Sequence, residues 1–207
     1  MRERLARQKD LKEFKRQKFL FAARTCISKN GLAGTSMRAI AQGSGYSLGA
    51  VYAYFSSKED IYAALLTSSL IELLRFIRSE LQQKTTGSQK TRHAFIAFLQ
   101  YFLASEEEQE LLFSFYARRN GSKHDVSEAT LHQLNNRFLS VLGFLANTVH
   151  QNGKLAADDA QSETLQAVTF LLGILQLSSS GQLLLIGQSP EEMVDQYLDQ
   201  MLLRCDR

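Results

Sequence analysis

Apolar residues recur at every third or fourth position along most of the chain, and glycine- or serine-containing segments interrupt this pattern. Such a period is typical of α-helices that bury one face. Runs of alternating Val, Ile and Thr, which mark β-strands, are missing. We therefore predict an all-α protein of about nine helices. Their approximate ranges are 3–29, 35–42, 48–54, 57–84, 89–104, 105–119, 125–152, 158–186 and 190–202.

Residues with strong capping preferences support the ends of these helices. Asn30-Gly31 ends the first helix, because glycine can adopt a left-handed C-terminal cap. Ser56-Ser57-Lys58-Glu59 has the form of a capping box, in which the outer serine and the glutamate satisfy backbone N–H groups at the start of the fourth helix. Ser189-Pro190-Glu191-Glu192 combines a serine cap with proline in the first turn, so we expect the last helix to begin there.

The eighth predicted helix is apolar on more than one face, through Leu165, Val168, Leu171, Leu172, Leu175 and Leu177. A single chain can cover only one side of such a helix, and large exposed apolar patches are rare on monomers. We therefore expect the last two helices to pair with their copies about a two-fold axis. The residues expected at this homodimer interface are Leu171, Leu175, Met193, Tyr197, Leu198 and Met201.

Charge divides the chain unevenly. Residues 1–60 hold twelve Lys/Arg and five Asp/Glu, whereas residues 61–207 hold twelve Lys/Arg and sixteen Asp/Glu. A basic N-terminal part indicates that one end of the molecule meets a polyanion. A solvated basic helix without a partner would give the same pattern, so charge alone does not decide between the two interpretations.

Residues 35–54 have the layout of a helix-turn-helix, with two short helices joined at Gly43-Ser44-Gly45. Gly45 suits the turn because it adopts positive φ without a Cβ clash. The first helix braces the second, which can then enter a major groove about 12 Å wide with its N-terminal residues facing the bases. Tyr46 and Val51 are the expected apolar anchors. This motif predicts binding to duplex DNA.

The residues of this motif and its flanks resemble the signature of the TetR (tetracycline repressor) family. The resemblance covers about residues 19–65 and rests on TSMRAIA at 35–41, GYSLGAVYAYF at 45–55 and SKE at 57–59. Gly43 departs from the family pattern because a larger helical residue is common there, and Tyr46 replaces a smaller aliphatic residue. The resemblance implies two domains: a helix-turn-helix DNA-binding domain with a basic extension at 1–57, and a helical ligand-binding and dimerisation domain at 58–207.

The resemblance also implies a function and its residues. It implies a regulator, most often a repressor, that leaves a palindromic double-stranded DNA operator when a small-molecule effector binds. The expected phosphate contacts are Thr35, Arg38, Tyr52, Tyr54 and Lys58, and the expected DNA-facing residues of the two short helices are Ser36, Ser47, Leu48, Gly49 and Ala50. The aromatic residues expected to line an effector pocket, for which core packing is the alternative, are Phe98, Tyr101, Phe102, Phe115, Phe138 and Phe170.

The basic residues at the N-terminus are further candidates for contacts with DNA. Arg2, Arg4, Arg7 and Lys9 precede the part that resembles the family, and flexible basic arms of other helix-turn-helix proteins add phosphate or minor-groove contacts. We expect the same here, with a plain solvated extension as the alternative.

Other functions have less support in the sequence. A constitutive or architectural DNA-binding protein without an effector is one alternative, and a helical enzyme with an incidental basic arm is another. Catalytic and nucleotide-binding motifs are missing, and the four histidines lack metal-ligand spacing, so we expect no enzyme, cofactor or metal site. The isolated Cys26 and Cys205 fit a reducing cytoplasm, and the apolar run at 167–177 is too short to span a bilayer. We therefore expect a cytoplasmic protein without a membrane partner.

Overall fold

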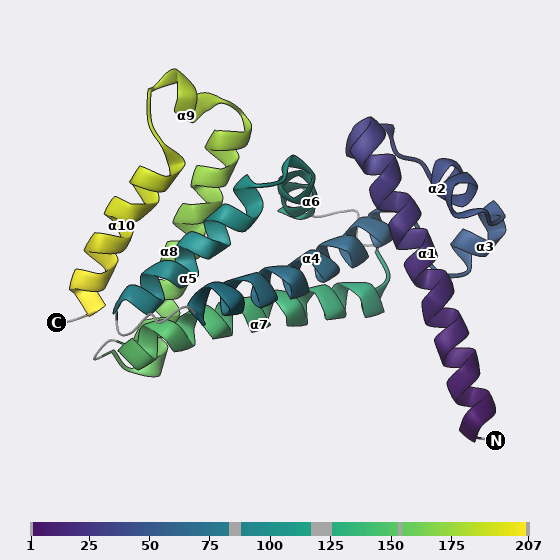
Figure 1. The fold of residues 1–207 in the computed structure, drawn as a ribbon, viewed down its shortest axis with the longest axis horizontal. Coiled ribbons are helices and arrows are strands. Elements are labelled where there is room, and N and C mark those ends of the chain that lie inside the picture. Colours follow the sequence, from purple (N-terminus) through teal and green to yellow (C-terminus); the bar gives the residue numbers. More distant parts are fainter. Residues whose placement is uncertain (1, 83–87, 117–125, 153–154, 206–207) are drawn as a thin grey trace. The chain divides into compact units, whose positions relative to one another are not determined.

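The computed structural model describes residues 2–82, 88–116, 126–152 and 155–205, and the secondary structure of these residues is entirely helical (Figure 1). The all-α prediction is confirmed, with ten helices in the described residues instead of about nine. They are α1 (Arg2–Gly34), α2 (Met37–Ser44), α3 (Leu48–Tyr52), α4 (Lys58–Leu81), α5 (Ser88–Leu103), α6 (Glu106–Tyr116), α7 (Glu128–Asn152), α8 (Ala157–Ser179), α9 (Gln182–Leu185) and α10 (Pro190–Cys205).

Two glycines with positive φ interrupt helices, one at the predicted end of the first helix and one inside the predicted eighth helix. Gly31 has φ 67° and ψ 176°, a backbone conformation open essentially only to glycine, and it breaks α1 before a last short turn that ends at Gly34. Gly181 has φ 71° and separates α8 from the short α9, so the predicted single helix at 158–186 is wrong. The predicted end of the sixth helix at 120–122 lies outside the described residues.

The chain forms two compact units. The first comprises residues 1–67 and 110–134, and the second comprises residues 68–109 and 135–207. The first unit therefore adds residues 110–134 to the N-terminal segment. The boundaries between the units fall inside α4, α6 and α7, so each of these helices contributes residues to both units.

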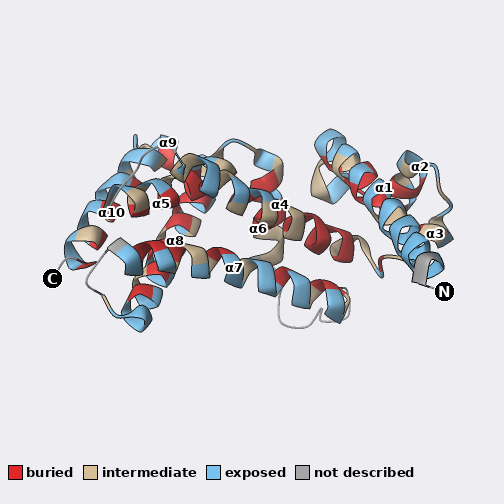
Figure 2. Ribbon diagram, turned by 60° about the horizontal axis from the view of Figure 1, so that its bottom comes forward, coloured by how far each residue is buried: buried red, intermediate tan, exposed pale blue. Residues whose placement is uncertain are grey.

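The core of the first unit is built from the inner faces of α1 to α4 and closed by Leu111 of α6. Its fully buried side chains include Phe19, Ile40, Val51 and Ile61, one from each of the four helices. Figure 2 shows how burial changes along α1, whose described residues up to Phe14 are exposed, whereas its second half carries buried positions. The N-terminal part of α1 therefore takes no part in this core.

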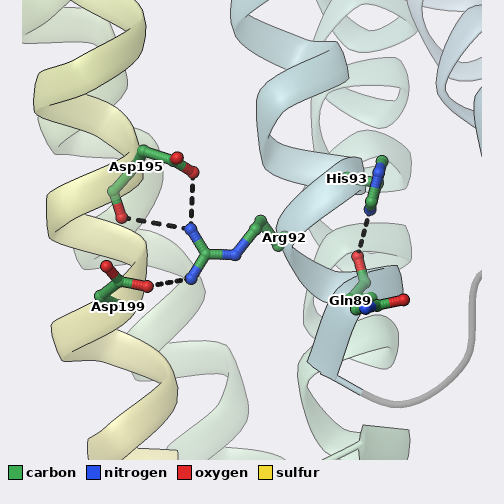
Figure 3. A network of polar contacts seen from close by, with 5 residues as sticks. All are labelled: Gln89, Arg92, His93, Asp195 and Asp199. Carbon is green, nitrogen blue, oxygen red and sulfur yellow. Dashed lines mark hydrogen bonds and ion pairs between the residues drawn. The ribbon is translucent and has the colours of Figure 1, made fainter.

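The core of the second unit brings together α5, α8 and α10, which pack against one another. Phe95, Phe98 and Phe102 of α5 are fully buried there. An ion-pair network joins α5 to α10 at the surface of this unit: Arg92 donates to Asp195 at 2.5 Å and also to Asp199 (Figure 3). Burial would lower the pKa of Arg92, but the hydrogen bonds to Asp199 and Asp195 outweigh it and hold that pKa above its usual value.

Burial corrects the predicted dimer interface. Four of its six residues have almost no surface to offer, because they fill the core of their own unit: Leu171, Leu175, Leu198 and Met201 are 0% exposed. Met193 and Tyr197 are half-buried, and the Tyr197 ring stacks on Phe170 with 4.4 Å between ring centroids. One face of the eighth helix is therefore covered within the chain by α5 and α10, whereas its Leu165 and Leu177 are exposed.

The predicted aromatic effector set is not gathered around one cavity. Phe98 and Phe102 are packed against each other in the core of the second unit, and Phe170 is stacked on Tyr197. Tyr101 lies edge-on to Phe102, and Phe138 is half-buried on α7. Phe115 lines a cavity in the first unit, apart from the other five. Core packing thus accounts for most of these rings.

Two further results concern the described residues only. Their helices contain no stretch long and apolar enough to cross a membrane. Nor do their His, Cys, Asp and Glu side chains gather in threes or more where a metal ion could be held.

Candidate nucleic-acid interface

The helix-turn-helix is fixed by two serine caps and one glycine. The Ser36 hydroxyl accepts the Ala39 N–H at 3.2 Å at the start of α2, and the Ser47 hydroxyl accepts the Ala50 N–H at 3.2 Å at the start of α3. Between them, Gly45 takes the left-handed conformation (φ 75°, ψ 21°), so the chain leaves α2 sharply. The predicted turn chemistry is therefore present at the predicted residues.

Aromatic packing anchors α3 on α1. Val51 is 0% exposed, and the rings of Tyr46 and Tyr54 lie edge-on to Phe19 with centroid distances of 5.2 and 5.3 Å. The tyrosine at position 46 is thus accommodated by the α1 ring. Nothing in the structure requires glycine at position 43, because a Cβ there would meet the Ala22 Cβ at 3.6 Å, an ordinary van der Waals contact. The end of α2 is helical with this glycine in place.

The outer edge of α3 and α2 remains open to solvent. Among the predicted DNA-binding residues, those that are exposed are Ser36, Arg38, Ser47, Gly49 and Tyr52, and those that are half-buried are Leu48, Ala50, Tyr54 and Lys58. Leu48 and Ala50 are half-buried and pack against the core of the unit, whereas Ser47 and Gly49 in the same turn of α3 are exposed. Nine of the ten predicted residues therefore keep some accessible surface.

Thr35 is the exception among the predicted phosphate contacts. It is 2% exposed, its hydroxyl donates to the Gly31 carbonyl at 2.9 Å, and its N–H donates to the Leu32 carbonyl at 3.3 Å. Both of its donors therefore stabilise the turn between α1 and α2. In this structure the Thr35 hydroxyl is therefore engaged at the broken end of α1 and is not exposed for a phosphate contact.

The two tyrosines at the end of α3 differ in exposure. Tyr52 is 53% exposed, whereas the ring of Tyr54 is packed on Phe19. Of the two tyrosines at and just after the end of α3, Tyr54 is the more buried. Tyr52 therefore offers the more accessible hydroxyl for a phosphate oxygen.

The start of α4 is capped one residue later than predicted. The Ser57 hydroxyl accepts the Asp60 N–H at 2.9 Å, and the Asp60 carboxylate accepts the Ser56 N–H at 3.0 Å. The sequence pattern assigned these two roles to Ser56 and Glu59. Either serine could cap the helix. The buried Asp60, which is 2% exposed, takes the role expected of Glu59, and the cap therefore falls on Ser57.

Asp60 is a site residue that the sequence did not reveal. Its second carboxylate oxygen accepts the Ser127 N–H at 3.2 Å and lies 3.0 Å from the Ser127 hydroxyl, just before α7. One buried carboxylate thus joins the exit of the helix-turn-helix to the start of α7 within the first unit. The partner lies 67 positions away, so no local pattern could have indicated this contact.

The basic extension is a continuous helix and not a flexible arm. The side chains of Arg4, Arg7, Lys9 and Lys12 are exposed along the first turns of α1. Further along, the Lys15 ammonium lies 5.9 Å from the centroid of Tyr46, and the Arg16 guanidinium lies 5.5 Å from that of Phe55. The basic face of α1 is therefore continuous with the α2–α3 motif in the same unit.

A small cavity lies behind the motif. It has a volume of about 240 Å³ and is lined by residues of α1, α4 and α6, including Leu32, Lys58, Tyr62 and Phe115. The Tyr62 hydroxyl donates to the Leu32 carbonyl at 2.8 Å, which ties α4 to the end of α1. Burial raises the pKa of Tyr62 to about 12, so this donor keeps its proton at neutral pH.

The segment that contains the helix-turn-helix is similar to a known protein family. Residues 19–65 match the family model for bacterial regulatory proteins of the tetR family. This part of the chain is therefore similar to regulatory proteins of the tetR family. The match covers the four helices that form the core of the first unit, from Phe19 of α1 to Leu65 of α4.

A curated protein is similar over a segment of comparable length. An uncharacterised HTH-type transcriptional regulator, YfiR, from Bacillus subtilis (strain 168) is 36% identical over 67 residues, which are 32% of this chain and 33% of that relative. The chain thus matches about a third of the length of this curated relative.

Solved structures extend the likeness of fold to almost the whole chain. A putative tetR family transcription regulator from Shewanella sp. PV-4 is similar with a TM-score of 0.61 and 19% identity, over 89% of this chain and 95% of that one. The transcriptional regulator FadR from Bacillus subtilis, solved in complex with stearoyl-CoA, is similar with a TM-score of 0.61 and 14% identity, over 90% and 97%. At these identities the likeness concerns the fold.

Proposed function

We propose that this protein is a cytoplasmic transcriptional regulator that binds duplex DNA through α3 as a homodimer, represses transcription, and leaves its operator when a small molecule binds. The observation that carries the proposal is the N-terminal turn of α3. It is capped by Ser47, anchored from behind by Val51, and open to solvent at Ser47, Gly49 and Tyr52. A helix so presented fits the major groove.

The residues divide by chemistry into two kinds of contact. Arg38, Tyr52, Tyr54 and Lys58 carry donors for phosphate oxygens, and Lys58 also begins α4, where free backbone N–H groups favour an anion. The residues at the leading edge of α3 are small or apolar, so Leu48 and Ala50 can offer only apolar contact, for example to a thymine methyl group. Bidentate base recognition then falls to Arg38, which is exposed on α2.

The salt dependence of DNA binding tests this proposal. If a dimer neutralises roughly 6–10 phosphates, the logarithm of the association constant falls against the logarithm of salt concentration with a slope of about −0.9 per contact. Lys58→Ala should reduce the slope by about one contact per chain and weaken all sequences alike. Arg75→Ala is the matched control, since this exposed arginine of α4 pairs with Glu72 in the second unit. An affinity independent of salt, or no duplex binding at any salt concentration, would refute the proposal.

The effector part of the proposal rests on linkage. An effector that binds the DNA-free protein better than the DNA-bound protein must weaken DNA binding. DNA must weaken effector binding by the same factor. The similar fold of FadR, solved with stearoyl-CoA, suggests a long-chain acyl compound as a first probe. A gel shift with and without stearoyl-CoA, and then with other lipophilic compounds, separates this proposal from a constitutive DNA-binding protein, whose affinity stays unchanged throughout.

A further inference from the structure

A second cavity lies between α7 and α8, entirely within the second unit. Its volume is about 440 Å³, within the range of small-molecule sites. The described residues that line it are Leu139, Leu142, Gly143, Ala146, Asn147 and His150 from α7, and Ala157, Gln161, Thr164 and Leu165 from α8. None of the six aromatic residues expected around an effector is among them. We refer to it as the α7–α8 pocket.

One buried hydroxyl in this pocket lacks a hydrogen-bond partner. Thr164 is 1% exposed and lines the pocket, yet its Oγ1 has no partner among the described residues. Other helical threonines donate to a carbonyl of the preceding turn, as Thr169 does to Leu165 at 2.8 Å and Thr67 to Ala63 at 2.7 Å. A buried polar group without a partner destabilises the free protein, so a ligand that satisfies it gains affinity.

The rest of the lining defines the chemistry of that ligand. Leu139, Leu142 and Leu165 supply an apolar wall, and Asn147, His150 and Gln161 supply hydrogen-bonding groups. The Nδ1 atom of His150 is engaged with the Leu155 carbonyl at 3.0 Å. Lys, Arg, Asp and Glu are missing from the described lining, so a charged ligand would find none of these side chains as an ion-pair partner there, whereas an uncharged one needs none.

We propose that the α7–α8 pocket binds a small uncharged amphiphile, with its apolar body against the leucines and a hydroxyl or amide group hydrogen-bonded to Thr164. The inference deepens the proposed function, because it names the effector site and the effector class of the proposed regulator. The site differs from the expected aromatic interior, which the described side chains fill.

The position of the pocket on α7 gives a route to the DNA-binding motif. The same continuous helix that lines the pocket from Leu139 to His150 begins directly after Ser127, which is bonded to Asp60 at the exit of the motif. A molecule inserted between α7 and α8 acts on the helix whose first residues hold that exit. Binding energy can therefore be linked to the arrangement of the motif.

The test uses N-phenyl-1-naphthylamine, an uncharged lipophilic fluorophore with one N–H donor, on the full-length protein. Gly143→Leu fills the pocket, because a Cβ at Gly143 meets nothing within 4 Å and its backbone is helical. Gly173→Leu is the matched control: this glycine also lies within a helix, its Cβ also meets nothing within 4 Å, and it does not line the pocket. We expect saturable binding to the wild type, an affinity lower by about tenfold or more in Gly143→Leu, and no change in Gly173→Leu, because only the first variant occupies the space.

Competition for the bound fluorophore tests the predicted chemistry. Decan-1-ol should displace it at lower concentration than decanoate or decyltrimethylammonium. Thr164→Val keeps the shape of the side chain and removes the hydroxyl, so the affinity for decan-1-ol should fall by about threefold to tenfold. Equal potency of the three competitors, or an unchanged affinity in Thr164→Val, would overturn the assigned ligand class.

The remaining outcomes separate this inference from the proposed function. Fluorophore binding needs no DNA, so specific binding that Gly143→Leu abolishes supports the pocket even if gel shifts show no operator binding. Equal fluorophore affinity in the wild type and Gly143→Leu overturns the pocket even if the protein binds DNA. A dimer that becomes monomeric in Gly143→Leu, without fluorophore binding in the wild type, overturns it in favour of a second copy of the chain covering this groove.

Discussion

At the scale of single residues, two threonine hydroxyls show why residue type does not fix a role. Thr35 was expected on a phosphate, but its hydroxyl is held by the Gly31 carbonyl. Thr164 belongs to an ordinary apolar helix pattern, and yet its hydroxyl is buried without a partner. Whether a hydroxyl is available depends on backbone geometry and on neighbouring helices. Neither is visible in a short sequence window.

Replacement of Thr35 distinguishes its structural role from a DNA contact. Thr35→Val removes the hydroxyl that donates to Gly31 and should lower the free energy of unfolding by about 1 kcal/mol. Thr35→Ser retains the hydroxyl and should recover most of that loss. The slope of DNA affinity against salt should be the same in both variants and the wild type, as measured by fluorescence anisotropy. A reduced slope in Thr35→Val with unchanged stability would restore Thr35 as a phosphate contact.

Tyr62 provides a prediction on pH. Its folded-state pKa of about 12 exceeds the ordinary value of 10.0, so the native state holds this proton more tightly than the unfolded state does. The stabilisation is complete below pH 10 and is lost as the pH rises from 10 to 12. Tyr62→Phe should therefore be less stable than the wild type at pH 8, by about 1 kcal/mol for the lost bond to Leu32.

The same variant makes the pH prediction measurable by urea unfolding. The gap in unfolding free energy between the wild type and Tyr62→Phe should narrow from pH 8 to pH 11, because only the wild type loses a bound proton at this position. Tyr52→Phe, at a residue that is 53% exposed, controls for the removal of a tyrosine hydroxyl. A gap for Tyr62→Phe that does not depend on pH would contradict the prediction.

At the scale of helices, the sequence predicts those helix ends that are set by hydrogen bonds between neighbouring residues. The turn at Gly45 is formed as expected, and the serine caps at Ser36 and Ser47 flank it; each of these bonds lies within four residues of sequence. The end of α8 was missed, since apolar residues continue in helical spacing past Gly181 into α9. The ion pairs of Arg92 with α10 were missed because their carboxylates lie more than a hundred residues away in the sequence, beyond the reach of any local pattern.

The helical N-terminal extension leads to a prediction about affinity. The exposed Arg4, Arg7 and Lys9 lie on the helix that carries Lys15 and Arg16 beside the α2–α3 motif. Deletion of residues 2–9 should weaken DNA binding and reduce the salt slope, because fewer counterions are released. Replacing the three cationic residues with Gln in the full-length chain should do the same, which separates charge from length. Unchanged affinity at low salt would show that the extension is only solvated.

At the scale of the whole molecule, the two units are joined by shared helices and not by a linker. Residues of α4 and α7 belong to both units, and Asp60 ties the beginnings of these two helices together within the first. A domain boundary at residue 57, expected from the family resemblance, marks the end of the motif. The compact unit around the motif also includes residues 110–134. Coupling between an effector and DNA can thus run along continuous backbone.

The proposed dimer needs a surface that the chain leaves uncovered. Burial of Leu175 and Leu198 removes both from consideration, and a charge at either should unfold the second unit instead of separating two chains. The most exposed apolar residues of the second unit form a run at α9 and directly after it, where Leu184, Leu185 and Ile186 are 86%, 85% and 65% exposed. Three adjacent apolar side chains in water are a liability that a self-complementary contact about a two-fold axis removes.

We therefore predict that the double variant Leu184→Glu and Leu185→Glu is folded but monomeric at micromolar concentration in sedimentation velocity. Its affinity for a full operator should be lost although α3 is intact, because two recognition helices about 34–36 Å apart require two chains. Leu11→Glu, at an exposed leucine of α1 in the other unit, is the control for adding a charge and should remain dimeric. A wild-type protein that sediments as a monomer and still binds the full operator would refute the dimer, and a dimeric double variant would place its interface elsewhere.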